Sequence, residues 1–222
     1  MIQSVAIGMS PSVAMDIAIL NDGMQRLGYY KSQWVSPLVI NDTLTVAGGP
    51  NGSLQMPIEF WLSADGKATY MICRSGTSCI RSFCEEFVVF VQNQGFSNVA
   101  IFTATSSPVS RERTSCRQIP EVFAYCNDAL LKMQPEYYKN NGIRKFGWWI
   151  EEVKKRPLQE LSEMFGEGWA SRLVKAFNKT SVQTAMFVIF TPSRIDFVGG
   201  YVLYNFMKLR TLFGSGAPQK LG

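Results

Sequence analysis

Residues 4–28 read SVAIGMSPSVAMDIAILNDGMQRLG, which indicates a strand, a turn and a helix in close succession. The apolar run at 5–7 ends at a glycine, as is typical of a short buried strand that leads into a turn. Ser10 and Pro11 follow as an N-cap hydroxyl and a proline at the first helical position. Apolar residues then recur every three or four positions, which predicts an amphipathic helix over 11–27 that ends at the closing glycine.

The rest of the chain continues this alternation of strands and helices. Such an order predicts a mostly parallel sheet covered on both faces, and two adjacent strands joined by a tight turn add an antiparallel portion. The predicted fold is α/β: a three-layer αβα sandwich with a mostly parallel mixed sheet, in a single domain over 1–211 followed by a flexible C-terminal tail at 212–222. We expect further strands within 29–40 and at 58–62, 68–73, 99–103, 122–126 and 185–190, and a loop or hairpin over 41–56. Helices are expected at about 78–94 and 193–210, and 158–178 is expected to be helical in two pieces broken near Gly166 and Gly168.

The composition excludes several classes of protein. The 222 residues are 46% hydrophobic and 18% charged, which is enough to bury a core and excludes disorder as the general state. The chain has no histidine, so Ser-His-Asp triads, Cys-His pairs and histidine metal ligands are all ruled out. No apolar run approaches the roughly 18 residues that span a bilayer, so we expect no membrane partner.

Positive charge is concentrated in the second half of the chain. Residues 1–110 carry 5 Lys/Arg and 7 Asp/Glu, whereas residues 111–222 carry 17 Lys/Arg and 10 Asp/Glu. A basic half can bind nucleic acid, a membrane surface or an acidic protein, and it can equally be a solvated surface. No nucleic-acid motif surrounds these residues, so we expect no nucleic-acid partner, although a nucleic-acid-binding module stays open as a third function.

Cysteine usage indicates a reducing compartment. The five cysteines, an odd number, are Cys73, Cys79, Cys84, Cys116 and Cys126. None forms a C-x-x-C pair, so neither a zinc site nor a thioredoxin-type site is indicated. The first three lie in apolar or helical surroundings and are predicted to be buried packing residues. Since the N-terminus also lacks the features of a signal peptide, we expect a cytoplasmic and nuclear protein.

Two strand-to-helix turns could bind phosphate, because free helix N–H groups attract anions. The first turn contains a single glycine, Gly8, instead of the glycine fingerprint of such sites, and Pro11 removes one backbone N–H donor. The second, at 76–78, lacks the lysine and the spacing of a P-loop, so helix capping is predicted there. Glu85 and Glu86 are adjacent and would point in different directions on a helix. We therefore predict no catalytic, cofactor or metal site, and a binding protein is favoured over an enzyme.

Two segments carry a resemblance to a known family. VAMDIAILN at 13–21, followed by RLGYY at 26–30, looks like the first helix and second strand of the proteasome assembly chaperone 2 family, and LFGSGAP at 212–218 looks like its closing segment. The resemblance implies a non-catalytic chaperone, without a cofactor, on a nucleoside-phosphorylase-like α/β fold. It further implies a heterodimer with proteasome assembly chaperone 1 that binds the α-subunit ring while the 20S core particle is built.

The tail holds the residues to which the resemblance gives a role in partner binding. In this family's system, a C-terminal hydrophobic-Tyr-any motif can insert into pockets between α subunits. Here Leu221 stands in place of the tyrosine and Lys220 in place of the hydrophobic residue. Either the partner supplies the anchor, or the tail docks weakly, or the natural chain ends differently. The candidate partner-binding residues are Leu212, Phe213, Gly214, Ser215, Gly216, Pro218 and Leu221.

Half of a permanent heterodimer should also expose an apolar face when it is alone. The sequence offers two candidate regions for this face, one around Tyr29, Tyr30 and Trp34 and the other at Trp148 and Trp149, and core packing explains both equally well. A nucleoside- or nucleotide-handling enzyme on a related α/β fold stays the alternative function, because strand-to-helix turns bind phosphate in many such proteins.

Overall fold

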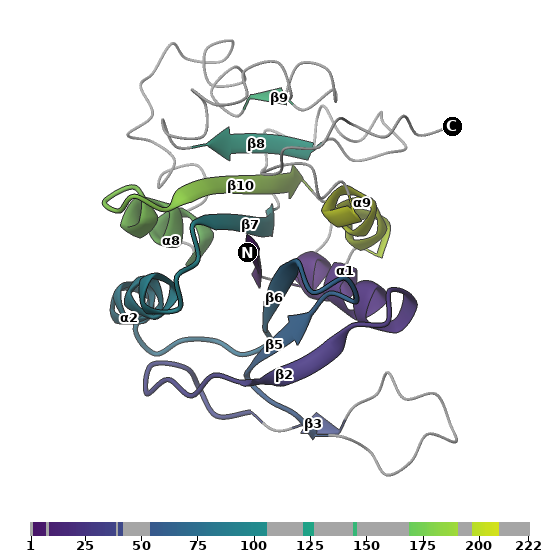
Figure 1. The fold of residues 1–222 in the computed structure, drawn as a ribbon, viewed down its shortest axis with the longest axis horizontal. Coiled ribbons are helices and arrows are strands. Elements are labelled where there is room, and N and C mark those ends of the chain that lie inside the picture. Colours follow the sequence, from purple (N-terminus) through teal and green to yellow (C-terminus); the bar gives the residue numbers. More distant parts are fainter. Residues whose placement is uncertain are drawn as a thin grey trace.

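A mixed eight-stranded sheet forms the centre of the computed structural model (Figure 1). The model describes residues 2–7, 9–38, 40–41, 54–105, 122–126, 144–145, 169–190 and 197–208. The strands of the sheet are β1 (Ile2–Ile7), β2 (Gln25–Tyr29), β5 (Ile58–Leu62), β6 (Ala68–Cys73), β7 (Asn98–Thr105), β8 (Val122–Cys126), β9 (Arg144–Lys145) and β10 (Gln183–Phe190). Their order across the sheet is β2-β5-β6-β1-β7-β10-β8-β9.

The middle of the sheet is parallel and its flanks are mixed. Strands β6, β1, β7 and β10 run parallel, with Val5 of β1 opposite Met71 of β6 and Ile101 of β7. Strand β5 pairs antiparallel with β6, and β2 pairs antiparallel with β5. On the other side β8 pairs antiparallel with β10, and β9 pairs parallel with β8. The predicted mostly parallel mixed sheet is therefore confirmed.

Helices cover both faces of this sheet. Helices α1 (Met9–Asn21) and α9 (Phe197–Lys208) lie on one face, and α2 (Ile80–Asn93) and α8 (Trp169–Phe177) lie on the other (Figure 1). Alternate side chains of each central strand enter two separate cores: Val5 packs with the α2/α8 layer, and Ala6 packs with the α1/α9 layer. The three-layer αβα arrangement is thus confirmed, while the likeness to nucleoside phosphorylases stays a prediction.

Several elements agree closely with the sequence. Strands β5 and β6 have the predicted bounds, and the turn between them places Gly66 in the left-handed region with φ 68°. The loop or hairpin expected over 41–56 begins and ends with the pair β3 (Ile40–Asn41) and β4 (Leu54–Gln55), which are antiparallel. The predicted strands at 99–103, 122–126 and 185–190 correspond to β7, β8 and β10.

The predicted end of the first helix is wrong. Helix α1 stops at Asn21, because Gly23 takes a left-handed φ of 61° and turns the chain. Residues that continued the apolar spacing, such as Leu27, belong to the exposed edge strand β2. Gly28 is accordingly not a helix cap but a strand residue opposite Phe60, beside a bulge. The strand expected within 29–40 is therefore wrong over most of that range: β2 reaches it only at Tyr29, and residues 30–38 hold only an isolated bridge between Val35 and Thr77.

The predicted start of the first helix also needs correction, whereas that of the second, at about 78, agrees to within two residues. Helix α1 begins at Met9, so Ser10 lies inside the first turn, buried and with no partner for its hydroxyl. Helix α2 begins after Cys79, which occupies the N-cap position without a side-chain capping bond. Within the described ranges, no helix combines the length and apolarity that crossing a membrane would require.

Other predictions lie partly or wholly outside the described residues. Of the two helical pieces expected over 158–178, the described part is α8, which follows the expected break at Gly168, and of the helix expected over 193–210 it is α9. The domain boundary at 211, the tail at 212–222 and Trp148 and Trp149 all fall outside.

Candidate interaction surface

Helices α1 and α9 pack against each other at very short range. A Cβ atom placed on Gly200 would lie 2.7 Å from Cγ1 of Val13, so only glycine fits at this point of α9. Further along, the Tyr204 hydroxyl donates a hydrogen bond of 3.0 Å to Oδ1 of Asp22, just after α1. These two contacts hold the helices as one unit on the sheet.

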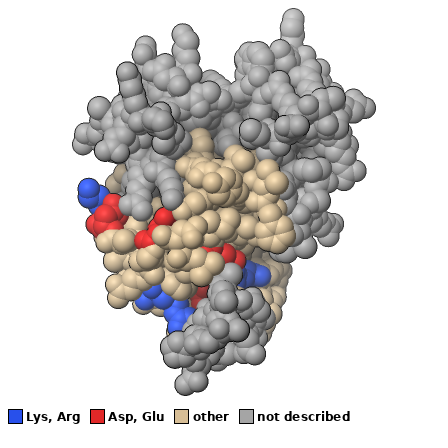
Figure 2. All heavy atoms as spheres, turned by 90° about the vertical axis from the view of Figure 1, so that its right-hand side faces the viewer, with Lys and Arg blue, Asp and Glu red and all other residues tan. Residues whose placement is uncertain are grey.

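The outer side of this pair is apolar. On α9, Phe197, Val198 and Tyr201 are exposed by 70%, 54% and 57%, and Leu20 on α1 is exposed by 57%. We call the outer surface formed by these four residues the helical face. Figure 2 looks onto this side of the molecule and shows a broad uncharged field with charged residues toward its margins. Isolated exposed apolar residues are common in proteins, but three within five residues of α9, with a fourth on the neighbouring helix α1, are typical of an interaction site.

The helical face carries almost no charge. Asp16 and Lys208 are the charged residues that the sequence has in α1 and α9. Of the side chains described on these helices, only that of Asp16 is charged, and its carboxylate accepts two hydrogen bonds from the Arg74 guanidinium. The charge of Asp16 is therefore neutralised on the sheet side of α1.

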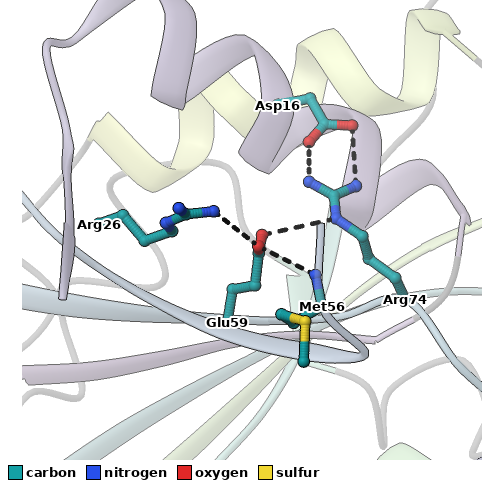
Figure 3. Close-up of polar contacts among 5 residues, drawn as sticks. All are labelled: Asp16, Arg26, Met56, Glu59 and Arg74. Carbon is teal, nitrogen blue, oxygen red and sulfur yellow. Dashed lines mark hydrogen bonds and ion pairs between the residues drawn. The ribbon is translucent and has the colours of Figure 1, made fainter. Parts of the chain in front are cut away.

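Arg74 belongs to a cluster of ion pairs under α1 (Figure 3). It follows β6 directly and lies at the carboxyl end of the parallel strands. Its Nη1 lies 3.2 Å from Oδ2 of Asp16, and its Nε lies 3.9 Å from Oε2 of Glu59. On the other side, Oε1 of Glu59 lies 3.5 Å from Nη1 of Arg26 and accepts a 3.1 Å hydrogen bond from the Met56 backbone N–H.

This cluster is electrically balanced, and it is buried at Glu59 while Arg26 reaches the surface with a 40% exposed side chain. Two carboxylates, Asp16 and Glu59, meet two guanidinium groups, Arg26 and Arg74, and the Glu59 side chain is only 1% exposed. The carboxyl ends of parallel strands are where α/β enzymes bind ligands, and a free cation there would attract phosphate. Arg74 instead contacts two carboxylates, so a phosphate would have to compete with both. The geometry favours a structural role that ties α1 to β5 and β6.

The second candidate phosphate turn, at 76–78, is used for packing. Oγ1 of Thr77 accepts a 2.9 Å hydrogen bond from the Trp169 indole, and the Ser78 hydroxyl donates one of 3.1 Å to the Trp34 carbonyl. The capping role predicted for this segment is therefore wrong, because its side chains bond to Trp34 and Trp169 rather than to the start of α2. Sequence reasoning could not find these bonds, since their partners lie 44 and 92 residues away.

The aromatic region predicted as a possible interface is divided by the sheet. Tyr29 is exposed on the edge strand β2. Tyr30 instead contacts the rings of Phe87 and Phe90, and its hydroxyl donates a 2.7 Å hydrogen bond to Glu86. Burial and the Glu86 carboxylate both raise the pKa of Tyr30. Tyr30 is thus a packing residue, and of this pair only Tyr29 is available to a partner.

The cysteine predictions are confirmed for two residues and wrong for one. Cys73 and Cys84 are buried, and burial raises the pKa of each thiol to about 12. Cys79 is only partly buried at the start of α2, where its sulfur lies 3.2 Å from the Ser82 hydroxyl. This contact lowers the pKa of Cys79.

The remaining site predictions can be placed against the structure. Among the described residues, no group of three or more His, Cys, Asp or Glu side chains could hold a metal ion. The helical face was not singled out by sequence reasoning, although the scarcity of charge in 9–21 and 197–208 was a visible signal. The predicted partner-binding residues Leu212, Phe213, Gly214, Ser215, Gly216, Pro218 and Leu221 lie outside the described residues.

The sheet order and the helical face define a three-layer α/β protein with an exposed apolar helical surface, and solved structures share this fold. A Thermoplasma acidophilum protein of unknown function aligns with a TM-score of 0.66 at 15% identity, covering 96% of this chain and 75% of that one. PbaA of Pyrococcus furiosus, described as an archaeal homolog of proteasome-assembly chaperone, aligns with a TM-score of 0.63 at 12% identity, covering 94% of this chain and 77% of that one.

Curated relatives make the likeness more specific. Proteasome assembly chaperone 2 of Homo sapiens is 25% identical over 154 residues, which cover 68% of this chain and 55% of that protein. The Mus musculus protein of the same name is 23% identical over 162 residues, which cover 72% and 58%. The chain thus spans little more than half the length of these relatives. No family profile matches it. The resemblance to proteasome assembly chaperone 2 is confirmed by these relatives.

Proposed function

We propose that this chain is a non-catalytic proteasome assembly chaperone subunit. In this proposal it pairs with proteasome assembly chaperone 1, and the heterodimer binds the α-subunit ring during assembly of the 20S core particle in the cytoplasm and nucleus. The observation that carries the proposal is the exposed, uncharged helical face, which is found in a chain whose curated relatives are proteasome assembly chaperones. A chaperone of this kind works by presenting surfaces, and the helical face is such a surface.

The C-terminal tail is the second surface in this proposal. Leu212, Phe213 and Leu221 supply apolar groups in a segment that could reach a neighbouring α subunit. Leu221 offers no hydroxyl, so the tail contributes less than a tyrosine anchor would. The positive charge of the second half would speed the encounter with an acidic partner surface.

The test is a binding measurement with purified components. The chain is mixed at micromolar concentration with proteasome assembly chaperone 1, with isolated α subunits, and with both, and complexes are separated by native gel and size-exclusion chromatography. We expect a one-to-one chaperone complex that then associates with α subunits. Binding to neither component would contradict the proposal. A thermal-shift screen with phosphate, nucleosides and nucleotides tests the enzymatic alternative in parallel, since a ligand of the native state would raise the melting temperature.

A further inference from the structure

We infer that the helical face is the binding site of the partner chaperone, a second folded chain that presents an apolar and uncharged helical surface of its own. This inference rests on the proposed function, because the proposed function supplies the partner. It adds where on the chain the partner sits, namely on Leu20, Phe197, Val198 and Tyr201 of α1 and α9. It also assigns the pairing to this side of the sheet rather than to the α2/α8 side.

The charge of the helical face restricts the occupant. Nucleic acid requires Lys or Arg side chains at its phosphates, and a peripheral membrane helix is rich in the same residues around its apolar side. An acidic protein surface would likewise require cations. The described side chains of α1 and α9 include no cation, and the anions of this helix pair are already engaged: Asp16 is bound by Arg74, and Asp22, just after α1, accepts a hydrogen bond from Tyr204. A matching surface must therefore be apolar and uncharged, as in the buried centre of a permanent protein interface.

The size of the face fits the centre of such an interface. Helices α1 and α9 have 13 and 12 residues, so each is about 20 Å long. Two helices side by side then present a field of about 400 Å², whereas a standard interface covers about 800 Å² on each partner. The charged residues at the margin of the field in Figure 2 would form the polar rim.

The face is also preorganised for binding. The close contact of Gly200 with Val13 and the hydrogen bond from Tyr204 to Asp22 fix α9 on α1 before any partner arrives. Phe197 and Tyr201 are separated by one helical turn, so both rings project from the same side of α9. Aromatic side chains on a rigid support lose little conformational freedom on binding and often dominate interface energy. These two residues are therefore the expected anchors.

The experiment compares two surfaces of the same chain. Phe197→Asp and Tyr201→Asp place charge on the helical face, whereas Val89→Asp places the same charge at a 55% exposed position on α2, on the other side of the sheet. Each variant and the wild type are titrated against proteasome assembly chaperone 1 of the same organism, and separately against isolated α subunits. Thermal melts establish that each variant is folded, and Leu20→Asp on α1 serves as a second variant of the face.

The inference expects the wild type and Val89→Asp to bind the partner chaperone equally, and the face variants to bind at least about tenfold more weakly. Unchanged binding by the folded face variants would overturn it and leave the proposed function standing. Loss of α-subunit binding alone, or a wild-type homodimer that the face variants dissolve, would also overturn it by assigning the face to another occupant. A wild type that binds neither component would contradict the proposed function itself and, with it, the inference.

Discussion

The two helical layers of this protein differ in what their outer sides present. In the α2/α8 layer, Arg81 and Glu85 form an ion pair with 78% and 64% of their side chains exposed, while Phe87 and Phe177 lie fully buried against the sheet. In the α1/α9 layer, apolar residues lie on both sides. A helix with one apolar stripe is covered once, by the sheet, whereas a helix that is apolar around most of its circumference is typically covered on both sides.

This difference separates folding from binding. In the α2/α8 layer, large apolar side chains contribute to stability because they are removed from water on folding. On the outer side of α9, side chains such as Phe197 stay in water in the isolated chain and would gain that energy only when a partner binds. Equivalent substitutions in the two layers should therefore have unequal effects on unfolding.

The largest expected difference in unfolding free energy is between two phenylalanine-to-alanine substitutions, one in each layer. Phe87→Ala should lower the free energy of unfolding by about 3–5 kcal/mol, because the ring is fully buried against Phe83, Phe177 and Tyr30. Phe197→Ala should change it by less than about 0.5 kcal/mol. Urea denaturation followed by circular dichroism measures both. A loss above about 2 kcal/mol for Phe197→Ala would mean that the helical face is covered within the chain itself.

The next effect compares one ion pair of each layer. Arg74→Met removes the partner of Asp16 and one of the partners of the buried Glu59, and it should cost about 3 kcal/mol of unfolding free energy. Arg81→Ala breaks the exposed pair with Glu85 and should cost less than about 0.5 kcal/mol. The double variant Glu59→Gln/Arg74→Met should lose less than the sum of the two single losses. Equal losses for Arg74→Met and Arg81→Ala would show that the cluster in Figure 3 does not tie α1 to the sheet.

A smaller effect is expected at the contact between α1 and α9. Gly200→Ala should destabilise the protein by about 1–2 kcal/mol, because the added methyl group meets Val13 and the clash exceeds the gain in helix propensity. Val13→Ala in the same chain should recover only part of the loss, because it removes the contact with Cγ1 of Val13 at 2.7 Å but leaves the contact with its Cβ at 2.9 Å. Gly76→Ala is the matched control, since a Cβ there meets nothing within 4 Å. Thermal denaturation of the wild type and the three variants measures these differences in stability. An unchanged stability of Gly200→Ala would mean that the helices can move apart.

Local sequence patterns predicted most of the fold. The strands β5, β6 and β10 are short apolar runs bounded by turn residues, so their places could be read directly. The end of α1 could not, because Met24 and Leu27 continue the helical spacing past the break at Gly23. Spacing alone does not distinguish a helix from an edge strand over so few residues.

The helical face was harder to predict for a physical reason. Because α9 is apolar around most of its circumference, with Asn205 and Lys208 as its only polar side chains besides the Tyr201 and Tyr204 hydroxyls, its sequence does not show clearly which residues face the sheet and which face solvent. That choice is set by Gly200, which turns one side of α9 toward α1. The cluster around Arg74 depends on a partner 58 residues away, Asp16, which no local motif can indicate. The predicted roles of the tail residues, including Leu221, stay predictions.

The smallest effect concerns thiol reactivity on the α2/α8 side, where Cys73 ends β6, Cys79 precedes α2 and Cys84 lies within α2. In a Cys116→Ser/Cys126→Ser background at pH 8, a thiol reagent should label Cys79 first, because its contact with Ser82 lowers the pKa of Cys79 and leaves more thiolate. Cys73 and Cys84, each with a pKa of about 12, stay almost wholly protonated at that pH and should react only after denaturation.

Ser82→Ala gives the control for the cause. Removing the hydroxyl should raise the pKa of Cys79, so its labelling rate at pH 7–8 should fall severalfold and the rise of rate with pH should move to higher pH. The stability of the fold should hardly change, since Cys79 is only partly buried. Mass spectrometry of the labelled peptides identifies each site. If Cys84 were labelled in the folded protein as fast as Cys79, α2 would have to open away from the sheet, and the α2/α8 layer would no longer be the more securely packed of the two.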